Sequence, residues 1–146
     1  ENAWRWSELP TEPPRFMVTR STEGSDDQAV ALLVNLSGTV RTEELPSDLS
    51  ESHSVYVLSP VDPATSNPSL IDSPAALANF ELCLREFLSL VEKTPGKIPR
   101  IALFAAIPVS AAVTIGRVLM PDVSPAWIVY DRDEQGMFFR ALEVKR

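Results

Sequence analysis

The sequence contains few of the residues that most often build chemical sites in proteins. It has one Cys and one His among 146 residues. A single Cys excludes an internal disulfide and any metal site made of several Cys, and a single His excludes the HExxH pattern and clusters of His ligands. His53 precedes an expected strand without an evident Ser or Cys partner, so nothing indicates a Ser-His-Asp triad. Cys83 lies at helical spacing among Phe80, Leu84 and Phe87, which favours a buried apolar side chain over a nucleophile.

Positive charge and long apolar runs are scarce as well. The chain carries 13 Lys and Arg against 20 Asp and Glu, a net charge of −7. This balance argues against a surface that binds long nucleic acid by bulk charge, although it leaves room for a small basic pocket. The most apolar stretch, residues 101–116, is shorter than the ~20 residues of a membrane span, and the N-terminus has no signal-peptide pattern. We therefore expect a cytoplasmic location, with no membrane and no long nucleic acid as partner.

The sequence is rich in Pro and poor in Gly, with thirteen of the one and five of the other, which indicates abrupt, ordered loops. Its length suits one domain. We expect residues 1–27 to be an irregular lead-in, because three Pro and an acidic run interrupt regular structure there. Within this lead-in, residues 16–18 have the composition of a short edge strand. The domain proper is expected over residues 28–146.

From residue 28 onward, apolar runs alternate with helical patterns. Residues 29–34 are continuously apolar, which is typical of a strand buried on both faces of a parallel sheet. A short helical pattern over residues 39–48 is broken at Pro46. The other elements expected are strands at residues 55–58, 101–105, 126–130 and 137–144, and helices from residue 74 to near Pro95 and over residues 111–119. This order predicts an α/β fold, Rossmann-like and three-layered, with a mainly parallel sheet and an antiparallel edge hairpin.

The helix that starts at residue 74 has the clearest local signals in the chain. Ser73 is a typical N-cap, and Pro74 suits the first helical position. Leu82 and Leu90 lie off the main apolar face of this helix. They indicate either a contact surface toward another domain or subunit, or the scattered exposed leucines that most surfaces carry.

Candidate binding residues gather where the expected strands end. Ligands of parallel sheets bind outside the carboxyl ends of the strands, near helix N-termini that favour anions. The residues at these ends are Ser37, Gly38, Ser59, Pro60, Ile107, Pro108, Ser110, Tyr130 and Arg132. The chain has no GxGxxG or Walker pattern, so an ordinary turn capped by Ser110 remains the alternative. In the lead-in, Trp4 and Trp6 flank Arg5, and this trio either stacks on nucleobases or anchors the lead-in to the domain.

The segment 101–121 resembles the best-marked part of the SAVED domain family. Members show a strand with a Phe-x-Ala-x-Pro pattern and then a helix of small residues that reaches Gly-Arg. The matching residues here are Phe104, Ala105 or Ala106, Pro108, Ala111, Gly116 and Arg117, and Tyr130-Asp131 resembles the next strand. The resemblance spans about residues 28–144. It implies a CARF-like fold and a sensor of bacterial antiphage systems, CRISPR-associated ones included, that binds a cyclic di-, tri- or oligonucleotide, oligomerises and activates a fused or partner effector.

The chain departs from that family in holding about one half of a SAVED domain, resembling the C-terminal half. Because family ligand sites use both halves, the resemblance implies that another half or protomer completes the pocket. No cofactor is expected, and no catalysis by this chain. In the proposed pocket, the N-termini of the helices expected near Ser37 and Ser110 would bind phosphates. Tyr130, Arg132 and the segment around Trp4 would supply charge and stacking. A ring nuclease or other hydrolase acting on the same ligand, and a scaffold without ligand, are the alternative functions.

Overall fold

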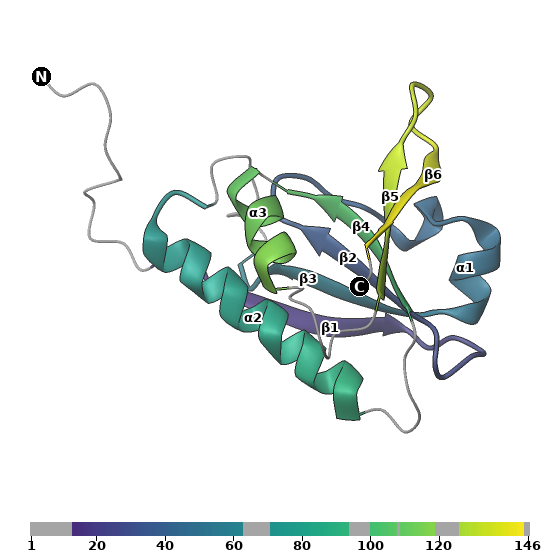
Figure 1. Ribbon diagram of the computed structural model, residues 1–146, viewed down its shortest axis with the longest axis horizontal. Coiled ribbons are helices and arrows are strands. Elements are labelled where there is room, and N and C mark those ends of the chain that lie inside the picture. Colours follow the sequence, from purple (N-terminus) through teal and green to yellow (C-terminus); the bar gives the residue numbers. More distant parts are fainter. Residues whose placement is uncertain (1–12, 63–70, 94–99, 108, 119–125, 145–146) are drawn as a thin grey trace, which may run out of the picture.

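The structure is a computed structural model that describes residues 13–62, 71–93, 100–107, 109–118 and 126–144. In these ranges the chain forms a sheet whose strands follow the order β1-β3-β2-β4-β5-β6 (Figure 1). The strands are β1 (Phe16–Thr22), β2 (Val30–Asn35), β3 (Ser54–Pro60), β4 (Arg100–Ala106), β5 (Ala126–Arg132) and β6 (Phe138–Val144). The helices are α1 (Ser47–Ser52), α2 (Pro74–Lys93) and α3 (Val109–Val118), with a short 3-10 turn, η1 (Thr42–Glu44), before α1.

The centre of the sheet is parallel and both of its edges are antiparallel. β3, β2, β4 and β5 run in one direction, while β1 pairs antiparallel with β3 and β6 pairs antiparallel with β5. The α/β class, the parallel core and the edge hairpin are therefore confirmed. The short edge strand expected at residues 16–18 is a seven-residue strand, so part of the lead-in joins the sheet.

Side chains alternate between two apolar clusters across the sheet. In β2, Val30, Leu32 and Val34 point into the cluster under α2 and α3, whereas Ala31 and Leu33 belong to the cluster under α1. This follows from the two-residue period of a strand, and all six residues of β2 are buried. Figure 1 shows α2 and α3 in front of the strands. The expected three layers are thus helices, sheet and helix.

Helix α2 begins where the capping signals predict. The Ser73 hydroxyl accepts a hydrogen bond from the Ala76 N–H at 3.1 Å, and Pro74 is the first helical residue. The helix buries one face against the sheet, with Phe80, Leu84 and Phe87 fully enclosed. None of the helices in the described ranges is long and apolar enough to cross a membrane.

The helix expected over residues 39–48 is wrong in its position. Residues 42–44 form η1, and α1 starts at Ser47, directly after the Pro that was expected to break the helix. Pro46 begins α1 because its carbonyl accepts hydrogen bonds from the Leu49 and Ser50 N–H groups at 2.9 and 3.0 Å. Its missing N–H is no loss at a helix start, where that donor would have no helical partner.

The β5–β6 connection is a tight turn, as the sequence predicts. The Asp133 N–H donates to the Met137 carbonyl at 2.9 Å, and the Gly136 N–H donates to the Asp133 carbonyl at 3.0 Å. Gly136 has φ of 82°, a conformation in which a side chain would be strained. This turn sets the end of β5, where two of the predicted site residues lie.

Candidate functional site

The carboxyl ends of β3, β2, β4 and β5 lie along one edge of the sheet. The ends of β2 and β4 are joined directly, because the Leu36 and Ser37 N–H groups both donate to the Ala106 carbonyl, at 3.0 and 2.9 Å. A Cβ placed on Gly38 would lie 3.5 Å from the Ala106 Cβ, so the loop after β2 runs beside the end of β4. We call this edge, with the loops that leave it, the carboxyl edge.

At the carboxyl edge, several predicted site residues lie close together where the two central strands, β2 and β4, end. Ser37 and Gly38 leave β2, and Ile107 leaves the neighbouring β4. Ser110 follows in the first turn of α3 and is exposed. The predicted residues Pro108 and Trp4 lie outside the described residues.

Ser59 and Pro60 lie farther along the same edge, toward β1. Both are the last residues of β3, where they pair with Met17 and Phe16 of β1. Pro60 is buried and Ser59 is half-buried. Because β2 and β4 separate β3 from β5, these two residues are not brought together with Tyr130 and Arg132.

The loop after β2 is held by a residue whose role sequence reasoning missed. The Asn35 side chain accepts a hydrogen bond from the Val40 N–H at 2.9 Å and donates one to the Val40 carbonyl at 3.2 Å. Asn35 is 9% exposed, so both bonds are shielded from water. The signal that could have identified Asn35 is an amide side chain at the end of an otherwise apolar strand. These bonds fix the loop that carries Ser37 and Gly38.

Tyr130 and Arg132 lie at the end of β5, on the α1 side of the sheet. The Tyr130 ring stacks on Phe104 with ring centres 4.5 Å apart, and Phe138 meets Phe104 edge-on. Burial raises the pKa of the Tyr130 hydroxyl, so it remains a neutral hydrogen-bonding group. The Arg132 guanidinium lies over the Phe138 ring, 4.3 Å from its centre. An aromatic surface and a cation thus stand side by side at this end of the edge.

Arg132 also makes two polar contacts through one nitrogen. Its Nη1 donates to Glu44 Oε2 at 2.8 Å and to the Gly136 carbonyl at 3.0 Å. Sequence reasoning did not single out Glu44, because nothing local links it to a residue 88 positions away. The ion pair joins the β5–β6 hairpin to the turn before α1.

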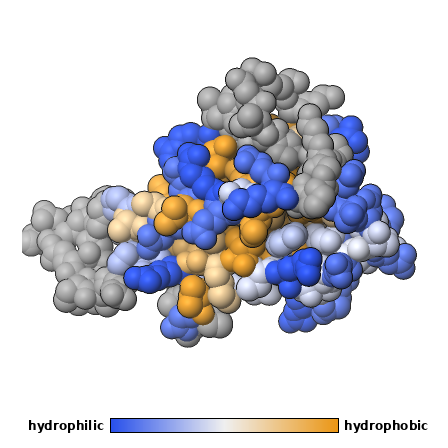
Figure 2. Space-filling model, turned by 90° about the horizontal axis from the view of Figure 1, so that it is seen from below, coloured by the Kyte–Doolittle hydropathy of each residue, from blue (hydrophilic) through white to orange (hydrophobic). Residues whose placement is uncertain are grey.

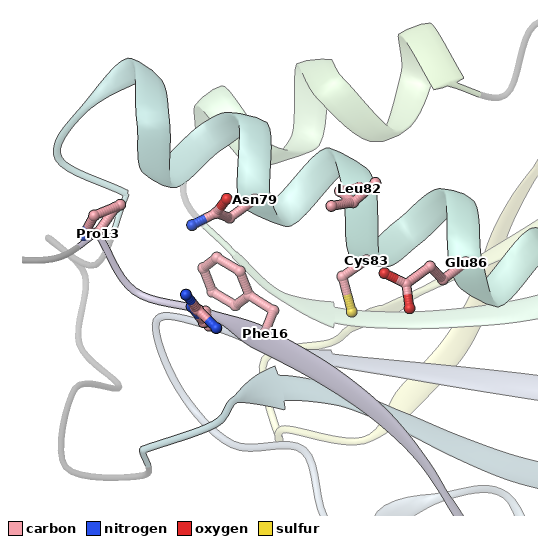
Figure 3. A pocket seen from close by; sticks show the side chains of 7 residues that line it. Pro13, Phe16, Asn79, Leu82, Cys83 and Glu86 are labelled. Atoms are coloured by element: carbon pink, nitrogen blue, oxygen red, sulfur yellow. The ribbon is translucent and has the colours of Figure 1, made fainter.

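A separate pocket of about 510 Å³ lies between β1 and α2. Phe16 projects from β1 toward α2, and Asn79, Cys83 and Glu86 line the pocket from α2 (Figure 3). Figure 2 views the molecule from below Figure 1 and shows apolar side chains gathered in the middle of that face. On α2, Leu82 and Leu90 are 60% and 50% exposed, which matches their expected place off the buried face. None of the predicted site residues lines this pocket.

The two residues considered for nucleophilic chemistry lie away from the carboxyl edge. Cys83 is buried on the inner side of α2, and burial raises the pKa of its thiol to about 12, so the thiol stays protonated at neutral pH. His53 follows α1 at the opposite end of β3, where its Nδ1 lies 2.8 Å from the Ser52 hydroxyl. Across the described ranges, no group of three or more His, Cys, Asp and Glu residues is placed to hold a metal ion.

Comparisons with known proteins identify the family and the fold of the chain. The sequence profile of SAVED, the "SMODS-associated and fused to various effectors sensor domain", matches residues 1–144. A comparison with curated protein sequences finds no match. Two solved structures of the Acinetobacter baumannii Cap4 SAVED/CARF-domain containing receptor share the fold. One holds the cyclic trinucleotide 3'3'3'-cAAA and aligns with a TM-score of 0.66 at 16% identity. The other holds 2'3'3'-cAAA and aligns with a TM-score of 0.65 at 18% identity.

The extent of these matches is uneven. Each alignment covers 93% of this chain but only 29% and 28% of the receptor chains. The chain therefore spans less than a third of the solved proteins that it matches. At these identities the likeness concerns the fold.

Proposed function

Because this chain belongs to the SAVED family of sensor domains, we propose that it binds a cyclic oligonucleotide at the carboxyl edge of its sheet. The observation that carries the proposal is the family match over residues 1–144. It is supported by the similar fold of a receptor described with cyclic trinucleotides. The chain itself contributes recognition; we assign any effector chemistry to other modules.

The chemistry of the carboxyl edge suits such a ligand. A cyclic oligonucleotide presents phosphates and aromatic bases together. The first turn of α3 offers backbone N–H groups, and Ser37 and Ser110 offer hydroxyls; both kinds of donor suit phosphate oxygens. At the β5 end, Arg132 supplies a cation and Tyr130 an aromatic ring for a base. The acidic surface elsewhere disfavours long nucleic acid, which depends on extended positive charge.

The chain supplies one part of a larger sensor. Its length relative to the solved receptors supports a second SAVED-type half, or another protomer, as the rest of the pocket. Ligand binding across that junction would drive oligomerisation and activate a fused or partner effector in an antiphage response. We place this response in the bacterial cytoplasm.

Thermal unfolding in the presence of cyclic triadenylate tests the proposal. A ligand that binds only the folded state adds ~2.7 kcal/mol of stability at 100 times its Kd. We expect a rise in Tm with the cyclic form and none with linear triadenylate. The measurement is made on this chain and on the full-length protein, so that a missing half is distinguished from a wrong function. No rise in the full-length protein with any cyclic di-, tri- or tetranucleotide would overturn the proposal.

Two matched variants locate the site. Ser110→Trp places a large side chain at the carboxyl edge, whereas Ser89→Trp places the same side chain on the exposed outer face of α2. We expect the first variant to abolish the rise in Tm and the second to retain it. Linear product in the same samples would instead support a ring nuclease.

A further inference from the structure

Arg132, the cation at the end of β5, is already bound to an anion of its own chain. Its Nη1 lies 2.8 Å from Glu44 Oε2, and the ring of Phe138 supports the guanidinium from one side. The side chains of Arg132 and Glu44 remain 37% and 33% exposed. A solute can therefore reach the pair without opening the core.

The other oxygen of the Glu44 carboxylate is also held. Glu44 Oε1 accepts a hydrogen bond from the Arg41 N–H at 2.8 Å, at the start of η1. The hydrogen bond from Arg132 comes first among the causes that lower the pKa of Glu44, and the bond from the Arg41 backbone comes next. The positive charge of the Arg41 side chain, which is exposed, acts in the same direction. The carboxylate is thus held in its ionised form by the Arg132 guanidinium and by the backbone N–H of Arg41.

A phosphate suits this position as well as a carboxylate does. Guanidinium groups bind both anions through the same donor geometry, and a phosphate brings more oxygens and more charge. We propose that the Arg132 guanidinium is a phosphate-binding site that Glu44 occupies in the free protein, and that the phosphate of an incoming ligand displaces Glu44. The identity of this ligand rests on the proposed function; the competition itself does not.

Displacement has a structural consequence. The Glu44–Arg132 pair connects η1, at the start of the α1 region, to the β5–β6 hairpin. When a phosphate takes the guanidinium, this connection is broken while Glu44 keeps its bond to the Arg41 N–H. Ligand binding then separates the hairpin from the α1 region at their exposed contact.

Titration with inorganic pyrophosphate, followed by the NMR signal of the Arg132 Nε–H group, tests the competition. Glu44→Gln removes the competing charge but leaves an oxygen for the Arg41 N–H. An exposed ion pair is weak, so we expect pyrophosphate to bind this variant about two- to fivefold more tightly than the wild-type chain. Glu43→Gln is the matched control, because Glu43 is bound by the Thr42 hydroxyl at 2.7 Å instead of by Arg132. Its affinity should stay at the wild-type level.

Equal gains in the two variants would show a general effect of charge and would overturn the proposal. So would a pyrophosphate titration that leaves the Arg132 signal unmoved in all three proteins. Cyclic triadenylate, titrated in parallel, separates this inference from the proposed function. If Glu44→Gln alone binds pyrophosphate more tightly, but the full-length protein binds no cyclic nucleotide, the inference is correct and the proposed function is wrong. Nucleotide binding with the same affinity in the wild type and both variants would leave the function standing and overturn the displacement of Glu44.

Discussion

The two faces of the sheet are built in different ways. The face under α2 and α3 carries the larger apolar cluster of the described residues, with the rings of Phe87 and Trp127 in contact at its centre. The face under α1 carries a smaller cluster, and α1 has six residues where α2 has twenty. At the rim of that smaller face, Arg132 contacts Glu44 and the Phe138 ring and so connects the chain segments.

This difference separates stability from recognition. Burial of apolar area under α2 and α3 supplies the larger share of the folding free energy. The α1 face instead ends in exposed contacts that are individually weak and exchange readily with solutes. A ligand site at that end can rearrange its polar contacts while the larger cluster keeps the sheet intact.

The same truncation on each face gives the sharpest test of this comparison. Leu84 is fully buried under α2, whereas Leu49 of α1 is 8% exposed. We expect Leu84→Ala to lower the free energy of unfolding by about 4 kcal/mol and Leu49→Ala by about 2 kcal/mol, because the short helix can relax into the space. Urea unfolding followed by circular dichroism measures both. Equal losses would mean that the two faces contribute alike.

The loop after β2 tests whether buried hydrogen bonds order the carboxyl edge. Asn35→Ala leaves the N–H and the carbonyl of Val40 without their side-chain partner, and we expect a loss of about 2 kcal/mol. Protection of the Val40 amide from hydrogen exchange should fall with it. Asn79→Ala, which removes a single half-buried bond to the Pro14 carbonyl, is the control. It should leave Val40 protected, and the idea fails if both variants expose Val40 equally.

The starts of α2 and α1 are expected to differ by a smaller amount of stability. Ser73→Ala removes the hydroxyl that accepts the Ala76 N–H, and we expect α2 to lose about 1 kcal/mol. Ser47→Ala, at the first residue of α1, removes no capping bond and should change stability by less than about 0.5 kcal/mol. Thermal unfolding of both variants measures the difference. A larger loss for Ser47→Ala would contradict the assigned cap.

The smallest effect concerns pH. Burial lowers the pKa of His53 below its usual value of 6.5, against the opposing charges of Asp26 and Asp48. The unfolded chain then binds a proton at a higher pH than the folded chain does, so stability falls as the pH drops from 6.5 toward the folded pKa. Unfolding between pH 5 and 7 should show this slope, and His53→Gln should flatten it. An unchanged slope in the variant would assign the titration to other groups.

Local signals predicted much of the fold. The continuous apolar run at residues 29–34 predicted β2, and Ser73 with Pro74 predicted the start of α2. Prediction failed at α1, because a Pro can interrupt a helix or begin one, and sequence spacing does not distinguish the two. It also predicted too short a β1, whose polar outer residues give no apolar pattern and whose partner is a strand far along the chain.

The candidate site was predicted less completely than the fold. The rule that ligands bind at the carboxyl ends of parallel strands named Ser37, Gly38, Tyr130 and Arg132, and these do lie at one edge. The rule could not indicate that Asn35 holds the loop after β2, or that Glu44 forms an ion pair with Arg132. Such contacts depend on side-chain directions that no short window of sequence specifies.

The sequence by itself determined most of the order of strands and helices, the burial of β2 on both faces, the cap of α2 and the β5–β6 turn. These follow from hydrophobic period and backbone preference, which act over a few neighbouring residues. Only the tertiary structure decided which strand ends lie side by side and on which face of the sheet each aromatic ring packs. It also decided that Glu44 binds Arg132, 88 positions away. The strand order sets those contacts, because it places chain segments side by side that share no local signal.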